Sequence, residues 1–346
     1  MDASRSAPCS VTLAVIFIPP PGLTSWPPVE SWTEREWTCW LSQHSYTPEQ
    51  IANYLNRDRF LYGVGLTPTG QRATPQNAYE KGVKWLYQPT PKGVTLHATR
   101  DGTISNFLRG GAVGGTKSIS ALWEAIQICL FPEREDIRVI IVRRELEELR
   151  RTHLDKLDQA ADAICTALGD PKAIKVTTQP ACATFLHTGA KVIGGHALNR
   201  GDERKYLSEH YDLFIGDEAT ELLWEQIVGI QGRLRNDPKR NKKARMMLTT
   251  NPGGPSHLEC VRHFITKDIT KAENPTYDPA DYAFIKASLY DNPYYMSQHG
   301  DFLEYEKRLW LHTEARRKQL LEGDWSAVVG QFFESFDPQL HVRAIA

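Results

Sequence analysis

The segment 110–118 carries the residue types that could bind a triphosphate. It reads Gly-Gly-Ala-Val-Gly-Gly-Thr-Lys-Ser. Glycines let backbone amides turn toward phosphate oxygens, and a helix that begins here adds its positive end. Lys117 would neutralise the β and γ phosphates, and the Ser118 hydroxyl would bind Mg²⁺. We therefore expect a nucleotide-binding loop made of Gly110, Gly111, Ala112, Val113, Gly114, Gly115, Thr116, Lys117 and Ser118.

Thr116 departs from the usual form of such a loop. The common pattern has glycine directly before the lysine, whereas this chain has Thr116 there. If the position requires a positive φ, a threonine is strained. A glycine-rich turn beside a chance lysine therefore stays open as the alternative to a phosphate loop.

Two adjacent carboxylates follow another apolar stretch. Leu213 to Ile215 reads as a buried strand, and Asp217 and Glu218 come at its carboxyl end. Ligands of open α/β sheets bind at that edge. Asp217 would then hold Mg²⁺, and Glu218 would act as the general base that polarises the attacking water. The alternative is a pair of solvated acids that cap a helix beginning near Thr220.

These groups sit in a pattern of apolar strands that alternate with amphipathic helices from Tyr87 onward, which is typical of an α/β fold with a mainly parallel sheet flanked by helices. The first expected strand leads into the glycines, and a helix follows the loop. The expected strands are 104–108, 138–142, 191–193, 213–215, 246–249 and 283–287, and the expected helices are 119–130 and one that begins at Glu145.

Composition sets limits on partners. The chain has 346 residues, 24% charged residues and a net charge of −1, so any DNA contact must be local, transient or shared among subunits.

The longest apolar run, Val11 to Ile18, is shorter than the about 20 residues that cross a bilayer, and we expect a buried strand or a loosely ordered leader. The six cysteines are scattered, and Cys260 with His263 is a weak alternative as a zinc pair.

Residues 1–84 differ from the rest because they are rich in proline and tryptophan and show no sustained period. Thr47 to Asn56 reads as a short capped helix with Pro48 in its first turn. A helix-turn-helix DNA reader could begin this way, but Gly63 and Gly65 fall where a recognition helix should follow.

The order of several further motifs resembles the large terminase family of tailed phages and related viruses. The resemblance runs from about Tyr87 to His341. The matching segments are 87–92, 139–144 with 148–149, 185–193, 205–206, 217–218, 249–254, 289–293, 316–325 and 330–333.

The resemblance implies a RecA-like ATPase of the additional-strand, catalytic-glutamate (ASCE) class, with ATP and Mg²⁺ as cofactors. It implies contacts of Gln88 and Pro91 with adenine, and a motif at Thr249, Thr250 and Asn251 that couples hydrolysis to motion. The ATPase domain would span 85–325, after an N-terminal extension of unclear role, 1–84. Residues 326–346 would be a linker and the start of a truncated nuclease domain, so no nuclease activity is expected.

The family's function implies the partners. The motor would translocate double-stranded DNA into a procapsid, as a homo-oligomeric ring that works with a portal protein and a small terminase subunit. It would act in the cytoplasm of the infected host cell, with no membrane contact. The alternatives are a helicase or repair ATPase, and a nucleotide-binding structural subunit without turnover.

Arginines could stabilise the charge that develops on the γ-phosphate. The resemblance puts Arg143 and Arg144 first, reaching into a neighbouring subunit; Arg233 and Arg235 come second, and Arg109 is third, acting in its own subunit. The basic stretch 233–245 could also touch DNA phosphates, although a solvated loop explains it equally well. The candidate DNA-binding residues are Arg233, Arg235, Lys239, Arg240, Lys242 and Lys243.

Overall fold

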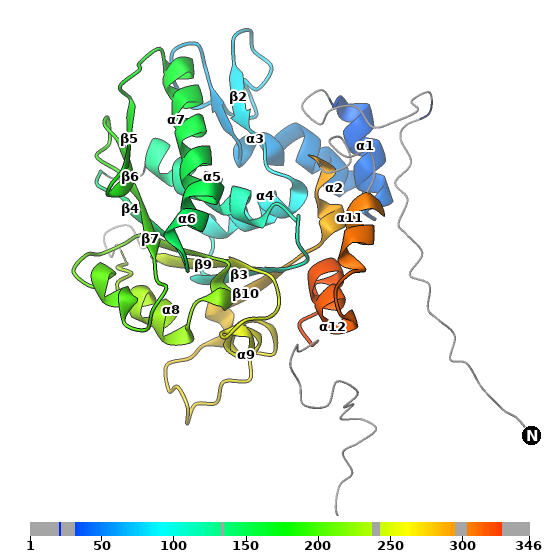
Figure 1. Ribbon diagram of the computed structural model, residues 1–346. Helices are drawn as coiled ribbons and strands as arrows, with labels where there is room; N and C mark the ends of the chain where they lie inside the picture. Colours follow the sequence, from blue (N-terminus) through cyan, green and yellow to red (C-terminus); the bar gives the residue numbers. More distant parts are fainter. Residues whose placement is uncertain (1–20, 22–31, 133–134, 237–242, 295–302, 327–346) are drawn as a thin grey trace, which may run out of the picture.

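An eight-stranded sheet forms the centre of the protein, with helices on both faces (Figure 1). The computed structural model describes residue 21 and residues 32–132, 135–236, 243–294 and 303–326. The strands lie in the order β10 (Tyr282–Ala287), β3 (Asn106–Gly111), β9 (Arg245–Thr250), β8 (Leu213–Asp217), β4 (Arg138–Arg143), β7 (Lys191–His196), β6 (Ala181–Phe185) and β5 (Ile174–Thr178).

The strands from β10 to β7 are parallel, and β6 and β5 continue the sheet as an antiparallel pair. Strands covered on both faces need continuous apolar runs, and β8 and β9 are buried along their whole length. This confirms the α/β fold with a mainly parallel sheet. The pair β5 and β6 lacked a strong sequence signal because its strands are short and half polar.

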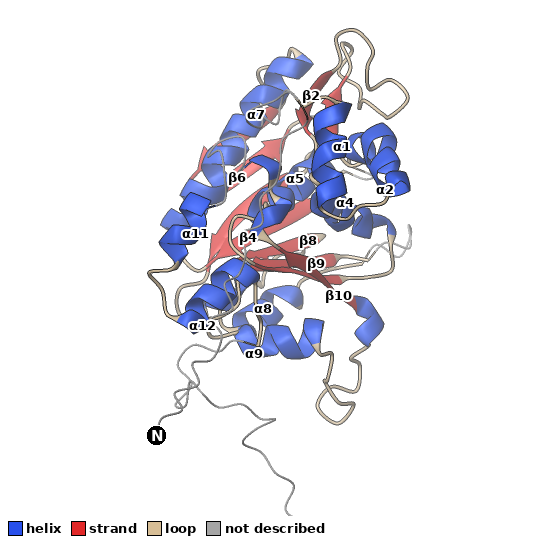
Figure 2. Cartoon of the chain, turned by 90° about the vertical axis from the view of Figure 1, so that its right-hand side faces the viewer, coloured by secondary structure: helices blue, strands red, loops and turns tan. Residues whose placement is uncertain are grey.

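Two layers of helices cover the sheet, as Figure 2 shows. One face packs against α4 (Pro91–Ala98), α5 (Lys117–Leu130) and α7 (Asp155–Leu168), and the other packs against α8 (Trp224–Gln231) and α9 (His257–Cys260). The charged helix expected from Glu145 is α6 (Leu146–Leu149), which continues through a π-helical turn, Arg150–Leu154, into α7.

The N-terminal part is helical and packs against the end of the sheet. It contains α1 (Glu34–Gln43), α2 (Pro48–Asn53), α3 (Arg59–Leu61) and β1 (Val64–Leu66), which pairs with β2 (Lys84–Tyr87). An apolar cluster that includes Trp37, Trp40 and Leu41 packs these helices against Leu289, just after β10. The expected boundary at residue 84 therefore falls at the start of a strand that pairs with the N-terminal part.

The capped helix expected at Thr47 is α2, and Thr47 and Gln50 form its capping box. A helix-turn-helix does not follow, because the chain continues through a π-helical turn, Tyr54–Asp58, and α3 into β1. The C-terminal helices are α11 (Leu303–Leu309) and α12 (Glu314–Arg317), which extends to Glu322. The expected strand or leader at Val11–Ile18 and almost all of the expected linker 326–346 lie outside the described residues.

A membrane-spanning helix is not found among the described residues. The weak zinc alternative also fails on geometry. Cys260 is fully buried in the core and the His263 ring bonds a backbone carbonyl, that of Glu259. In the part of the chain that the structure describes, no cluster of three His, Cys, Asp or Glu side chains could hold a metal ion.

A buried ionic cluster joins α5 to β9 and α4. Glu124 is fully buried, and its carboxylate accepts hydrogen bonds from His97 Nδ1 at 2.7 Å, Arg100 Nη2 at 2.5 Å and Arg245 Nη2 at 2.5 Å. Burial opposes ionisation, but Arg100, Arg245 and His97 together hold the pKa of Glu124 well below its usual value. The carboxylate therefore stays ionised inside the protein.

Replacing Glu124 by glutamine should destabilise the protein by about 3–5 kcal/mol, because two arginines would remain buried without their counter-charge. Urea denaturation at pH 7 measures the loss. Since the pKa of Glu124 is depressed, its stabilising contribution exists above the usual glutamate pKa and disappears as the pH falls below it. Glu147→Gln is the matched control, since Glu147 is exposed, and a comparable loss there would contradict the argument.

Candidate active site

The segment 112–116 forms the loop between β3 and α5, at the carboxyl edge of the parallel sheet. Gly110 and Gly111 end β3, which is longer than expected, and Gly111 has φ +144°. A Cβ on Gly111 would lie 2.2 Å from the carbonyl oxygen of Ala287, so only glycine fits there. Asn292 Nδ2 donates to Gly114 O at 2.7 Å, and Val113 N donates to Leu320 O at 2.9 Å. The loop is thus held from two sides.

Thr116 adopts the left-handed conformation, with φ +57° and ψ +23°. A β-branched residue in this region is strained by about 1–3 kcal/mol. The strain expected from the sequence is therefore present, directly before Lys117.

Lys117 is almost fully buried, and its ammonium group donates to Ala112 O at 2.5 Å and to Asn251 Oδ1 at 2.9 Å. Burial lowers the pKa of Lys117 to about 8, although Glu218 and Asp217 act in the opposite direction. The ammonium group faces the space enclosed by the loop and has no carboxylate within ion-pair distance among the described residues. An anion placed in that space would restore its full charge.

Asp217 ends β8 and is fully buried, yet it is surrounded by donors. Its carboxylate accepts hydrogen bonds from Ser118 Oγ at 2.6 Å, His153 Nε2 at 2.8 Å and Thr249 Oγ1, and Arg143 Nε lies 3.4 Å away. Burial opposes ionisation, but His153, Arg143 and Ser118 lower the pKa of Asp217. The side chain is therefore an anion at neutral pH.

Ser118, Asp217 and Thr249 offer hydroxyl and carboxylate oxygens in one place, and Mg²⁺ prefers such hard donors. The residues present thus fit the metal that the sequence led us to expect.

Glu218 follows in a left-handed conformation, with φ +50°. Its carboxylate lies 3.4 Å from Asn251 Nδ2 and 3.8 Å from Arg143 Nη2, and it borders the cavity. Burial, with help from the charge of Asp217, raises the pKa of Glu218. The adjacent acids therefore have opposite shifts, which is the pattern of a metal ligand beside a proton acceptor.

Asn251 connects these groups. It follows β9 and bonds both Lys117 and Glu218 through its amide. Thr249 and Thr250 are fully buried behind it. The Thr250 hydroxyl lies 2.6 Å from that of Thr220, just beyond the acids, so β9 is tied directly to the end of β8.

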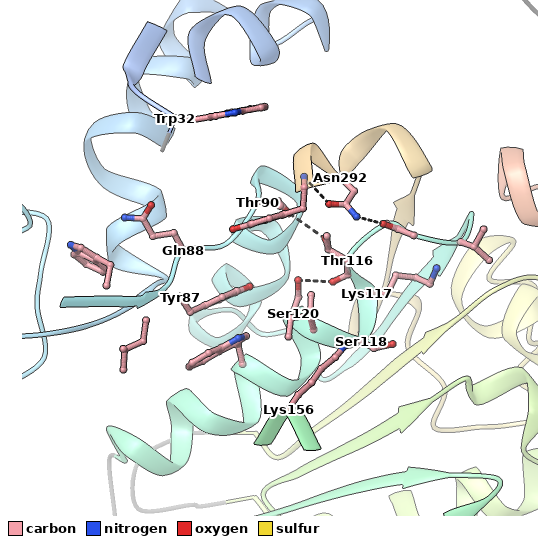
Figure 3. A pocket seen from close by; sticks show the side chains of 18 of the residues that line it. Trp32, Tyr87, Gln88, Thr90, Thr116, Lys117, Ser118, Ser120, Lys156 and Asn292 are labelled. Atoms are coloured by element: carbon pink, nitrogen blue, oxygen red, sulfur yellow. Dashed lines mark hydrogen bonds between the residues drawn. The ribbon is translucent and has the colours of Figure 1, made fainter. Parts of the chain in front are cut away.

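A cavity of about 980 Å³ extends from the loop to an aromatic end. Tyr87 stacks on Trp123 with ring centroids 4.9 Å apart, and the Tyr87 hydroxyl lies 3.0 Å from His97 Nε2, which fixes the ring. Trp32 and Trp37 of the N-terminal part also line the cavity. Figure 3 shows Tyr87 and Gln88 on the left of the pocket, Lys117 on the right, and Trp32 above.

The structure separates the expected loop residues into two sets. Val113 to Ser118 line the cavity, as do Gln88, Glu218 and Asn251. Gly110, Gly111 and Ala112 are buried behind it, because β3 runs on to Gly111. Pro91 is also absent from the lining, because it is the first residue of α4, where its missing N–H costs no hydrogen bond.

The arginines are placed differently from what was expected. Arg143 does not reach outward to a neighbouring subunit, because its side chain is buried against Asp217 and Thr152 of its own chain. Arg144 is half-exposed and lies 3.7 Å from Glu221. Arg109 is fully buried and bonds backbone of the loop, so it does not face the cavity.

The described parts of the basic stretch, 233–236 and 243–245, lie at the opposite edge of the sheet from the cavity. Arg233 and Arg235 flank Leu234, which forms an isolated bridge with Tyr211 just before β8, and Lys243 pairs with Asp281 at 2.7 Å just before β10. Arg233 and Arg235 have no carboxylate partner in the described part of the chain; their guanidinium groups bond backbone carbonyls. Lys239, Arg240 and Lys242 lie outside the described residues.

Several site residues had no sequence signal. His153, Trp32 and Lys156 belong to segments remote from both motifs, and nothing in their spacing points to the cavity. The sequence also gives no indication that the backbone of Glu218 is left-handed. Only the tertiary fold brings them together.

The strand order and the loop have the arrangement of the phosphate-loop NTPase fold. β9 lies between β3, which leads into the loop, and β8, which ends in the acids. This extra strand and a glutamate next to the buried aspartate are the marks of the additional-strand, catalytic-glutamate class.

The sequence and the structure were compared with those of known proteins. No protein-family profile matches the sequence, and no curated protein matches it either. Among solved structures, the large terminase from a thermophilic bacteriophage superposes with a TM-score of 0.51 at 12% identity, over 69% of this chain and 54% of that one. The same terminase has been solved with ATP-gamma-S and with ADP.

Two other terminases are also similar. The HK97 bacteriophage large terminase has a TM-score of 0.48 and 10% identity, over 80% of this chain and 55% of that one. The Thermus phage P74-26 large terminase ATPase domain has a TM-score of 0.47 and 13% identity, over 69% of this chain and 94% of that domain. The chain spans about half the length of the first terminase and of the HK97 protein. The likeness to the terminase from the thermophilic bacteriophage shows a shared fold.

Replacing Lys117 by methionine should stabilise the protein against unfolding. The pKa lowering from 10.5 to about 8 means that the buried charge costs up to about 3 kcal/mol. The cost applies below pH 8 and fades as the pH rises toward 10.5, because the folded state then releases its proton. Thermal unfolding at pH 7 measures the gain, with exposed Lys172→Met as control. An unchanged or lower melting temperature would contradict the argument.

Proposed function

We propose that this chain is the ATP-hydrolysing part of a large terminase, the motor that packages double-stranded DNA into a viral procapsid. The observation that carries the proposal is the convergence of Lys117, Ser118, Asp217 and Glu218 at one end of a nucleotide-sized cavity. The fold shared with the large terminase from a thermophilic bacteriophage supports it.

The phosphates of ATP would lie along the loop, with the base at the aromatic end beside Tyr87 and Gln88. Backbone amides of the loop and the first turn of α5 would donate to phosphate oxygens, and Lys117 would neutralise their charge. Ser118 and Asp217 would hold Mg²⁺, which supplies charge neutralisation at the β and γ phosphates when bound.

Glu218 would accept the proton of the attacking water. Its raised pKa suits a group that takes up a proton during the reaction and releases it afterwards. Arg143 lies close to both acids and would keep Glu218 oriented.

Asn251 would couple the nucleotide to motion. Its amide bonds both Lys117 and Glu218. A phosphate would add a third acceptor to an ammonium group that already donates to Ala112 and Asn251, and a shift of Lys117 toward the phosphate would be passed through Asn251 to the turn after β9. Arg316 Nη1 lies 3.3 Å from Pro252 O, so such a shift would reach the C-terminal helices.

The assembly and location follow from the proposed function. The protein would form a homo-oligomeric ring with the portal protein and the small terminase subunit, in the cytoplasm of the infected cell. The Arg144 side chain is half-exposed, and this exposure supports the proposal that it contacts a neighbouring subunit in that ring. The basic stretch at the opposite edge would contact DNA phosphates, which makes the contact independent of sequence.

The isosteric change Glu218→Gln should lower kcat for ATP hydrolysis by about 100-fold or more, because the proton acceptor is lost. ATP binding should remain measurable. In the unchanged protein kcat should fall as the pH drops through a value above 4.5, since the base must be ionised and its pKa is raised. Phosphate release and nucleotide titration check both points.

Glu221→Gln is the control for Glu218, because Glu221 lies three residues away and is half-exposed. It should leave kcat within about twofold, as expected for a surface substitution. Full activity of the Glu218→Gln variant would show that Glu218 is not the general base. If the unchanged protein releases no phosphate, with or without DNA, the proposal that it is an ATPase is wrong.

The double change Arg233→Gln, Arg235→Gln should weaken DNA binding uniformly across sequences and lower the slope of log affinity against log salt by up to about 2, one for each lost phosphate contact. Fluorescence anisotropy with a duplex at several salt concentrations measures it. Arg200→Gln is the control, since Arg200 is exposed and paired with Glu225. An unchanged slope would mean that the basic stretch is a solvated loop.

A further inference from the structure

Arg109 is a buried cation with an unusual set of partners. Its side chain, on β3, is fully buried and makes no ion pair with a carboxylate in the described part of the chain. Nη2 donates to Gly115 O at 2.9 Å and to Thr116 Oγ1 at 3.0 Å, and Nη1 lies 3.4 Å from Thr116 O. All three acceptors belong to the last two residues before Lys117.

Burying an unneutralised guanidinium is unfavourable, and an apolar side chain of similar size would cost less. Burial lowers the pKa of Arg109 to about 10, with Tyr87 and Asp291 only partly opposing it. A contribution to stability alone therefore does not explain an arginine here. All the side-chain hydrogen bonds that Arg109 makes are to Gly115 and Thr116 of the loop.

Thr116 needs such support. It occupies the position where a phosphate loop usually has glycine, and it has the positive φ that glycine adopts without strain. Its carbonyl oxygen accepts from Ser120 N at 3.2 Å and from Ser120 Oγ at 2.9 Å, which starts α5. Its hydroxyl lies 3.4 Å from that of Thr90 (Figure 3). The direction of the Lys117 and Ser118 amides depends on this residue.

We propose that Arg109 is a positioning residue for the phosphates, and that it acts as a pair with Thr116. Arg109 holds Thr116 in the left-handed conformation and so aims the amides at the start of α5 into the cavity. The inference rests on the proposed nucleotide binding and adds a residue that acts through the loop without touching the ligand.

The pairing makes a specific prediction about two substitutions. Glycine at position 116 adopts a positive φ unaided and offers no hydroxyl to Arg109. Arg109 should therefore matter much less once Thr116 is glycine. A merely structural arginine would matter equally in both backgrounds, because its loss would be independent of the side chain at 116.

The experiment is a double-substitution cycle in the full chain, with Arg109→Met, Thr116→Gly and both together. ATP affinity is measured by titration with Mg·ATP, kcat and KM by phosphate release, and folding by thermal unfolding. Arg109→Met should raise Kd and KM about tenfold or more, since it removes charge-assisted bonds to the loop, with a smaller effect on kcat. Thr116→Gly should stay within about threefold of the unchanged protein, and the double variant should resemble Thr116→Gly.

Equal fold-changes for Arg109→Met in the two backgrounds would overturn the pairing. Arg100→Met is the control, because Arg100 pairs with buried Glu124 away from the loop and should show no dependence on position 116. If Arg109→Met fails to fold, Arg109→Lys in both backgrounds replaces it. Lysine keeps the charge but not the forked donors, and an equal effect in both backgrounds again overturns the pairing.

Separate outcomes test the proposed function and the role of Arg109. If the unchanged protein does not bind Mg·ATP in the same titration, the proposed function fails. If it binds and the cycle shows no coupling, the proposed function stands and the role of Arg109 fails.

Discussion

The Asp217 carboxylate is kept ionised inside the protein, and most of the site depends on how this is done. A buried anion is stable only with donors or opposite charges around it. Here the donors come from four places in the chain: Ser118 from α5, Thr249 from β9, His153 from the turn before α7, and Arg143 from β4. The same carboxylate therefore fixes how the loop, β9 and the helical layer meet.

The polar groups around it bond one another. Lys117 bonds Asn251 and Ala112, and Ser118 bonds Asp217. Under the proposed function, a triphosphate with Mg²⁺ would meet the same Lys117 and Ser118 groups, so its binding would be linked to the turn after β9 through the bond between Lys117 and Asn251. The structure thus supplies a physical reason why nucleotide occupancy and motion would be coupled.

Segments outside the sheet complete the cavity. The N-terminal helices pack on Leu289 and bring Trp32 and Trp37 to the aromatic end, and Asn292 then bonds the loop at Gly114. On the other side the helix that ends at Glu322 accepts a hydrogen bond from Val113 through Leu320. The C-terminal helix therefore contacts the loop directly, and the N-terminal helices are linked to it through the segment 289–292.

The sequence alone determined the loop, the acid pair and the alternation of strands and helices, because these are local: glycines beside a lysine, acids after an apolar run, and short-range periodicity. It could not show that Gly110 and Gly111 belong to β3, that Arg143 turns inward, or that Arg109 supports Thr116. Those outcomes depend on where a strand ends and which side chains meet across long separations. Only packing of the whole chain decides them, because a buried charge takes whatever partners the fold brings within hydrogen-bond distance.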